Sequence, residues 1–68
     1  MDIKIQIGKR VRELRNKIGI SQEELADRAN LDRTYITSVE CGKRNISIVN
    51  IEKIAIALEI SLAEFFRF

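Results

Sequence analysis

The chain has 68 residues, of which 46% are apolar, three are glycine and none is proline, a composition that predicts one nearly all-helical domain over residues 1–68 with a small core. The chain has one cysteine and no histidine, which excludes an internal disulfide and a zinc cluster and predicts a reducing, cytoplasmic setting. It has no apolar run of about 18 residues, which argues against a membrane-spanning helix. The net charge is +2, made up of +3 for residues 1–45 (ten basic, seven acidic) and −1 for residues 46–68 (two basic, three acidic). This distribution indicates either an N-terminal half that faces nucleic acid and a C-terminal half that faces a partner, or only a solvated charge pattern.

A first amphipathic helix is predicted from about Asp2 to Lys17. Apolar residues recur along it at spacings of four and three, and they are Ile3, Ile7, Val11, Leu14 and Ile18. Gly19 ends the helix, and Ile18 and Ile20 on either side of it can pack together. The opposite face is basic and is expected to be mostly solvated, and it consists of Lys9, Arg10, Arg12, Arg15 and Lys17.

Two short helices joined by a tight turn, a helix-turn-helix, are predicted between Ser21 and Gly42. Ser21 and Glu24 have the spacing of a capping box, which satisfies the free amides at the start of a helix that runs to about Ala29. Asn30 tolerates the left-handed backbone conformation and therefore ends this helix. Small Ala26 allows the two helices to approach closely where they cross.

The second helix of the pair is predicted to begin after Asp32, whose side chain can cap it. Ile36, Val39 and Glu40 share one of its faces, and mainly short polar side chains share the other, namely Arg33, Thr34, Thr37, Ser38 and Cys41. Short side chains let a helix enter the major groove of DNA, where the longer Arg33 can reach base edges. If this helix is considered by itself, its polar face could equally be an ordinary solvated surface with no binding role.

A basic loop, KRNIS, follows Gly42. Its side chains Lys43, Arg44 and Asn45 can contact phosphate oxygens and so fix the position of the preceding helix on DNA. Lys43 can also compensate the negative end of that helix, and the two roles are compatible. Ser47 caps a fourth helix, predicted over about 48–58, whose inward stripe is Ile48, Ile51, Ile54, Ala55 and Leu58, and Ile60 continues this core.

A short fifth helix is predicted within LAEFFRF, where Ser61 and Glu64 form a second capping box. Three aromatic rings within four residues exceed what so small a core can hold. We expect Phe65 to pack inside with Leu62, and we expect an exposed patch that needs a partner, made of Ile46, Val49, Phe66 and Phe68. The predicted partner is a second copy of the chain. The alternative is that all three rings pack within the monomer.

The segment from Ser21 to Gly42 resembles the helix-turn-helix of phage repressors, Cro proteins and the wider XRE-type family, in which Gln22, Glu40 and Gly42 have counterparts. Within that family, NLDRTYITSVECGKRNISIVNIEKI is most similar to controller proteins of bacterial restriction-modification systems, which implies autoregulation and control of neighbouring restriction-modification genes. The resemblance covers nearly the whole chain and implies a compact five-helix, all-α domain. The chain departs from the family at Asn30, where many relatives have glycine, and at Cys41, where a polar or basic residue is commoner.

The resemblance also implies roles for individual residues. Arg15 is expected to pair with Glu40 in a partly buried ion pair that orients Arg15 towards a phosphate. Gln22 is expected to hold the DNA backbone through its amide and the dipole of its helix. The positions that match DNA contacts in the family are Gln22, Arg33, Thr34, Tyr35, Ser38, Arg44 and Asn45.

The sequence therefore predicts a homodimeric, sequence-specific regulator of transcription that binds double-stranded DNA with inverted-repeat half-sites, without a cofactor or small-molecule ligand. Base edges would be read by Arg33, Thr34, Thr37 and Ser38, with Tyr35 at the groove edge. A phage-type repressor, or an antitoxin-like protein-interaction module, would have the same fold. Enzymatic activity is not expected, because the commonest general base, histidine, is missing and the adjacent Glu23 and Glu24 do not face each other.

Overall fold

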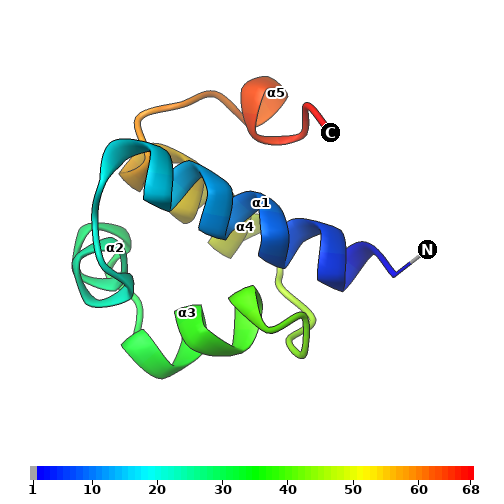
Figure 1. Cartoon of the computed structure of the whole chain (residues 1–68), viewed down its shortest axis with the longest axis horizontal. Coiled ribbons are helices and arrows are strands. Elements are labelled where there is room, and N and C mark those ends of the chain that lie inside the picture. Colours follow the sequence, from blue (N-terminus) through cyan, green and yellow to red (C-terminus); the bar gives the residue numbers. More distant parts are fainter. Residues whose placement is uncertain (1) are drawn as a thin grey trace.

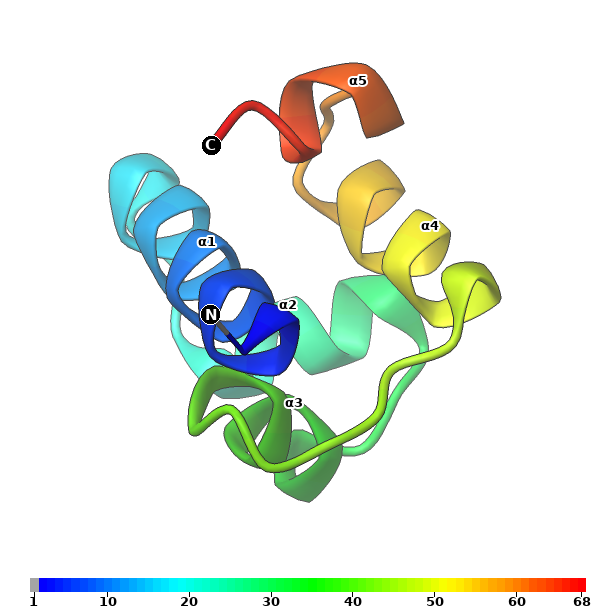
Figure 2. The same cartoon turned by 90° about the vertical axis from the view of Figure 1, so that its right-hand side faces the viewer.

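The computed structural model describes residues 2–68 as five α-helices joined by short connections, as Figure 1 shows. These helices are α1 (Ile3–Ile18), α2 (Gln22–Ala29), α3 (Arg33–Glu40), α4 (Ile48–Ala57) and α5 (Leu62–Phe65). α3 packs against α1 and α2, α2 also packs against α4, and α5 packs on the end of α4 (Figure 2). The predicted all-α, five-helix architecture is confirmed.

Local chemistry accounts for most helix ends. Ser21, Ser47 and Ser61 each accept a hydrogen bond from the backbone amide three residues later, at 3.0 to 3.1 Å. Gly19 and Asn30 end α1 and α2 in the left-handed conformation, with φ of 76° and 57°. The predicted starts at the three serines and ends at Gly19 and Asn30 are therefore confirmed.

Three capping predictions need correction. Asp32 occupies the position before α3, but its side chain makes no capping hydrogen bond. The carboxylate of Glu24 accepts a hydrogen bond from Arg28 Nε, one turn further along α2, at 2.9 Å. The carboxylate of Glu64 is bonded to Arg10 and Arg67. The two capping boxes are thus formed only from the serine side, because arginine is the stronger partner for a carboxylate.

The core lies between the inner faces of the helices. Its fully buried side chains come from all five of them, and the largest are Phe65, Leu25, Ile36, Ile54 and Val11. The prediction placed Ile48 on an inward stripe, and Ile3 and Ile18 on the apolar face of the first helix, but all three side chains are exposed. Each is the first or last residue of its helix, where the neighbouring helices no longer cover it. Ile20, by contrast, packs against the core.

The crossing of α1 over α3 is tight. A Cβ atom added to Gly8 would lie 2.3 Å from the carbonyl oxygen of Val39, which is well inside contact distance. Only glycine fits at this point. The close approach brings the basic side of α1 within hydrogen-bonding distance of Glu40 at the end of α3.

Candidate nucleic-acid interface

The outward face of α3 is polar, and its inward face holds the helix in the core. Ile36, Val39 and Glu40 are buried, whereas Arg33, Thr34 and Thr37 are exposed and Ser38 is half-buried. Cys41, directly after the helix, is exposed and carries a free thiol. The two faces are divided as the helical spacing of the sequence indicates.

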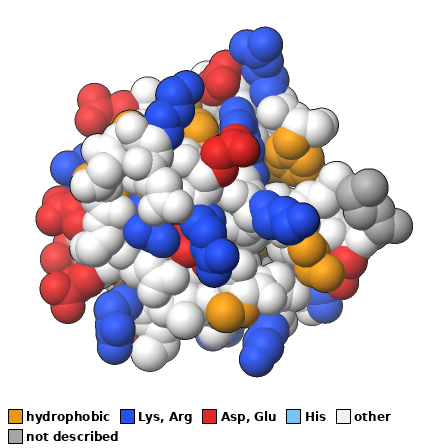
Figure 3. Space-filling model, viewed as in Figure 1, with side chains coloured by type: hydrophobic (Ala, Val, Ile, Leu, Met, Phe, Trp, Pro, Cys, Tyr) orange, Lys and Arg blue, Asp and Glu red, His pale blue; other side chains and the backbone are white. Residues whose placement is uncertain are grey.

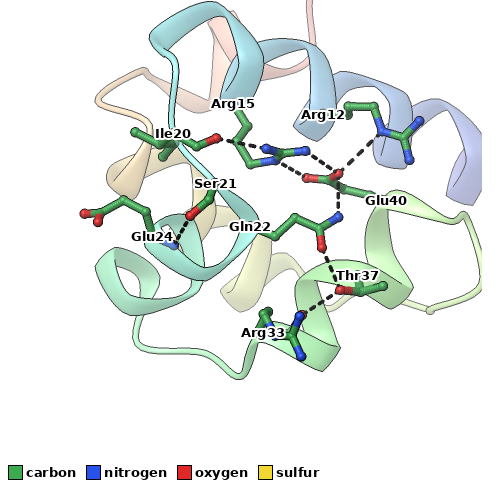
Figure 4. A network of polar contacts seen from close by, with 9 residues as sticks. All are labelled: Arg12, Arg15, Ile20, Ser21, Gln22, Glu24, Arg33, Thr37 and Glu40. Carbon is green, nitrogen blue, oxygen red and sulfur yellow. Dashed lines mark hydrogen bonds and ion pairs between the residues drawn. The ribbon is translucent and has the colours of Figure 1, made fainter.

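A buried carboxylate organises the polar contacts behind this face. Glu40 accepts hydrogen bonds from Arg15 Nε at 2.7 Å, Arg15 Nη2 at 3.0 Å and Gln22 Nε2 at 3.0 Å (Figure 4). The Glu40 side chain is 0% exposed and that of Arg15 is 13% exposed. Burial alone would raise the pKa of the Glu40 carboxyl, but the hydrogen bonds from Arg15 and Gln22 and the charge of Arg15 outweigh it and hold that pKa below its ordinary value.

The expected pairing of Arg15 with Glu40 is present, and it occupies most of the Arg15 guanidinium. Arg15 Nη1 also donates to the carbonyl oxygen of Ile20 at 2.9 Å, so each of its three nitrogens has a partner. A second arginine, Arg12, lies on the same side of α1 with its Nε 3.5 Å from Glu40 Oε1, and its side chain is 56% exposed. Arg12 is thus the more exposed of the two arginines that bond Glu40. Sequence reasoning missed it, although the three-residue spacing from Arg15 places both on one helix face.

Gln22 connects the ion pair to the outward face of α3. Its side-chain oxygen accepts a hydrogen bond from Thr37 Oγ1 at 2.8 Å, while its nitrogen donates to Glu40. The Thr37 hydroxyl also lies 3.1 Å from the carbonyl oxygen of Arg33 in the same helix. The amide of Gln22 is therefore held in one orientation, with one N–H still available. The sequence placed Gln22 and Thr37 in the site separately and did not reveal that they bond.

Tyr35 lies in the first turn of α3, and it is half-buried. Its hydroxyl oxygen accepts a hydrogen bond from Asn50 Nδ2 at 3.0 Å. The guanidinium carbon of Arg44 lies 4.7 Å from the centre of the Tyr35 ring, a cation–π contact. The ring thus forms a platform for the basic loop. Asn50 was not singled out from the sequence, because only the fold brings it to Tyr35.

The basic loop after α3 presents its three predicted contact residues, Lys43, Arg44 and Asn45, to solvent. In the space-filling view of Figure 3, Lys and Arg side chains are spread over the centre and lower edge of the molecule, across α1 and α3. Acidic side chains gather at the left edge, over α2, and others lie scattered at the upper edge, near the centre and at the right. The face that carries α3 and the Glu40 network is therefore the more basic side of this view, as an interface with phosphates requires.

The C-terminal aromatic rings are divided between core and surface. Phe65 is fully buried, whereas Phe66 is 40% and Phe68 is 54% exposed. The centroids of the Phe66 and Phe68 rings lie 6.2 Å apart. The alternative that all three rings pack within the monomer is therefore wrong. Val49 is exposed, whereas Ile46 is half-buried against the core.

The exposed apolar side chains on α4 and after α5 differ in part from the expected set. Ile46 contributes less than expected, because part of its side chain covers the core. Ile56 of α4 is strongly exposed and was overlooked. It follows Val49 by seven residues, a spacing that places both on one side of a helix, so the sequence held the signal. We call the residues Val49, Ile56, Phe66 and Phe68 the apolar patch.

Neither a metal-binding cluster nor a membrane-spanning helix occurs within residues 2–68. No group of His, Cys, Asp and Glu side chains among them could hold a metal ion. None of the helices in this range is both long and apolar enough to cross a membrane.

Comparison with known proteins gives consistent matches. The helix-turn-helix family matches residues 11–65. The control protein C.MunI of a Mycoplasma species is 52% identical over 66 residues, covering 96% of this chain and 89% of that protein. The restriction-modification controller protein C.AhdI from Aeromonas hydrophila is 51% identical, with a TM-score of 0.90 over 93% of this chain and 91% of that one. The controller protein C.Esp1396I, solved as a tetramer with its natural 35 base-pair operator, is 36% identical, with a TM-score of 0.91 over 97% of this chain and 87% of that one.

Proposed function

This chain belongs to the XRE-type helix-turn-helix family, and from that premise we propose that it is the DNA-binding transcriptional controller of a restriction-modification system. The observation that carries the proposal is the arrangement around α3, whose polar face is exposed while the buried Glu40 ties it to α1 and α2. A helix held in this way can enter the major groove without losing its orientation. The whole chain then acts as one DNA-binding domain in the cytoplasm, and binding requires no catalytic step.

Base recognition is assigned to the exposed side of α3. Arg33 lies in its first turn, where a guanidinium can bond bidentately to guanine in the major groove. Thr34, Thr37 and Ser38 are short enough to let the helix approach, and each can donate or accept a hydrogen bond. Tyr35, whose hydroxyl is bonded to Asn50, contributes at the edge of the groove through its ring and through Arg44.

Contacts with the phosphate backbone are assigned to the groups that surround this helix. Gln22 opens α2, where the free amides and the helix dipole favour an anion. The loop after α3 supplies two cations and an amide next to it. We assign phosphate contacts to Gln22, Lys43, Arg44, Asn45, Arg15 and Arg12, with Arg12 more accessible than Arg15.

The proposed functional unit is a two-fold homodimer. The apolar patch, Val49, Ile56, Phe66 and Phe68, lies on α4 and after α5, and a second copy of the same surface would cover it. Such a dimer presents two copies of α3 about one DNA turn, roughly 34 Å, apart. Its operator would then contain inverted-repeat half-sites.

Selection of bound duplexes from a random library tests this function directly. We expect an inverted repeat to be enriched, with an affinity at least about a thousandfold above that for random DNA at the same salt concentration. Affinity should also fall steeply as salt rises, because phosphate contacts release counterions. Equal affinity for all duplexes would instead favour a protein-interaction module with the same fold.

A further inference from the structure

Arg10 makes contacts that DNA reading does not explain. It lies in the middle of α1, where the sequence indicated a solvated basic face, yet its side chain is only 11% exposed. Its guanidinium reaches α5, at the other end of the chain. Burying an arginine is unfavourable unless its N–H donors have hydrogen-bond partners, and α5 supplies most of these partners for Arg10.

The guanidinium of Arg10 holds the end of α5 by its backbone. Nε donates to the carbonyl oxygen of Phe65 at 2.9 Å, and Nη2 donates to that of Glu64 at 2.6 Å, across 55 and 54 residues of sequence. Nη2 also lies 3.3 Å from the Glu64 carboxylate, and Nη1 pairs with Glu13 in α1. Hydrogen bonds from a charged donor are among the stronger ones, and a planar guanidinium fixes their direction.

α5 depends on such external support. It has only four residues, and a helix that short is unstable by itself because nucleation is unfavourable. The last carbonyl groups of a helix have no partner within it. Ser61 caps the start of α5. At its end, the buried ring of Phe65 anchors the helix in the core, and Arg10 donates to the last carbonyl groups.

The apolar patch begins where this support acts. Phe66 directly follows the carbonyl of Phe65 that Arg10 holds, and the Phe66 amide donates to Leu62 at 3.1 Å. Phe68 lines the same hollow as Arg10 on the side of α1. The position of both exposed rings relative to the rest of the molecule is therefore set in part by Arg10.

We propose that Arg10 is a positioning residue for dimerisation, which fixes α5 so that Phe66 and Phe68 are presented to a second copy of the chain. The proposal rests on the dimer interface of the proposed function. α1 then connects the dimer interface to the DNA-reading surface, because Arg10 bonds α5 while Arg12 and Arg15 bond Glu40 of α3. The spacing of the two reading helices in the dimer depends on this connection.

The test compares Arg10→Met, which keeps the apolar stem, and Arg10→Lys, which keeps the charge, with Lys17→Gln, which removes one exposed positive charge from the same helix. Hydrogen exchange at the amides of Phe65 and Phe66 reports the opening of α5, and sedimentation reports the dimer dissociation constant. We expect Arg10→Met to speed exchange in α5 with little change in α1–α4, and to raise the dissociation constant about tenfold or more. Arg10→Lys should change both the exchange rate in α5 and the dissociation constant less than Arg10→Met does. Lys17→Gln should change neither quantity.

DNA binding separates positioning from contact. At a protein concentration far above the raised dissociation constant, Arg10→Met should bind the selected duplex as the wild type does, because its reading surface is intact. A persistent loss under these conditions would mean that Arg10 acts on DNA, which overturns the proposal.

Three other outcomes would also overturn it. If α5 stays protected in Arg10→Met, Arg10 does not hold it, and if protection falls equally throughout α1–α4, Arg10 stabilises the whole fold. If α5 opens but dimerisation is unchanged, α5 does not set the interface. A wild-type-like dimer in Phe66→Ser, with α5 still protected, would instead show that the proposed interface itself is wrong, whatever Arg10 does.

Discussion

The hydroxyl of Thr37 donates a hydrogen bond to the side-chain oxygen of Gln22, 2.8 Å away, and so links the outward face of α3 to the start of α2. The Gln22 nitrogen continues this link to the buried Glu40. A group expected to read bases and a group expected to hold a phosphate are therefore parts of one network. Changes at either should affect the other.

Replacing Thr37 with valine removes the hydroxyl while nearly keeping the shape of the side chain. We expect operator affinity to fall by about 0.5–1.5 kcal/mol, because Gln22 loses the bond that orients it, with little change in folding stability. Affinities of Thr37→Val, Gln22→Ala and the double variant form a mutant cycle. The double loss should be smaller than the sum of the single losses, and strict additivity would mean that the two residues act independently.

Arg33→Ala and Lys43→Ala should weaken DNA binding in different ways. Loss of Arg33 should cost about 1–3 kcal/mol and relax specificity at one base pair in each half-site, because a bidentate base contact disappears. Loss of Lys43 should weaken all sequences alike and reduce the salt slope by about one. Titrations with operator and random duplexes at several salt concentrations measure both. An equal loss on both duplexes for Arg33→Ala would reassign Arg33 to phosphate contact.

Glu40→Ala should destabilise the fold by about 3–5 kcal/mol, because it leaves the mostly buried guanidinium of Arg15 without its carboxylate. Chemical denaturation measures this loss. Glu23→Ala is the matched control, since Glu23 is an exposed carboxylate at the start of α2, and it should change stability by less than about 0.5 kcal/mol. Similar denaturation midpoints for the two variants would contradict a structural role for Glu40.

The same pair should make stability depend on pH in the acid range. The pKa of Glu40 is lower in the folded protein than its ordinary value of 4.5, so the folded state gains stability above that value from the ionised carboxyl. This contribution is lost as the pH falls through the folded-state pKa. Denaturation of the wild type and Glu40→Gln at about pH 7 and pH 3 should show a stability difference that narrows on acidification. A stability difference between the two proteins that is the same at both pH values would exclude this link between ionisation of Glu40 and folding.

Phe66→Ser should shift the protein towards monomer, since it places a hydroxyl in an apolar interface, and so should Ile56→Ser if α4 contributes as proposed. Ile3→Ser is the control, because Ile3 is also an exposed large apolar residue but lies on α1, outside the apolar patch. Sedimentation at micromolar concentration distinguishes them. Both patch variants should also bind an isolated half-site as the wild type does while losing affinity for the inverted repeat. An undiminished dimer in both would place the interface elsewhere.

Local chemistry made the helices predictable. Ser21, Ser47 and Ser61 bond amides only three residues away, and glycine and asparagine tolerate the left-handed conformation of Gly19 and Asn30, so these signals need no knowledge of the fold. The division of α3 into a polar and a buried face followed from helical periodicity in the same way. The family resemblance added the pairing of Arg15 with Glu40, which spacing alone does not reveal.

The features that could not be predicted from the sequence are contacts between residues far apart along the chain. The destination of Arg10 lies more than 50 residues away, and a basic side chain at a helical position reads as solvated until α5 is placed against it. Ile48 lies on an apolar stripe, but no neighbouring helix covers the first residue of α4. Asn50 became part of the site only because α4 begins beside Tyr35.

The close crossing at Gly8 bears on how substitutions in related chains should be interpreted. Any side chain there would push α1 away from the carbonyl groups at the end of α3, and it would separate Arg12 and Arg15 from Glu40. A variant at this position could therefore lose operator binding although Gly8 itself is buried and cannot touch DNA. A glycine retained here over evolutionary time would record the geometry of a helix crossing, and it would be misread as a mark of direct recognition.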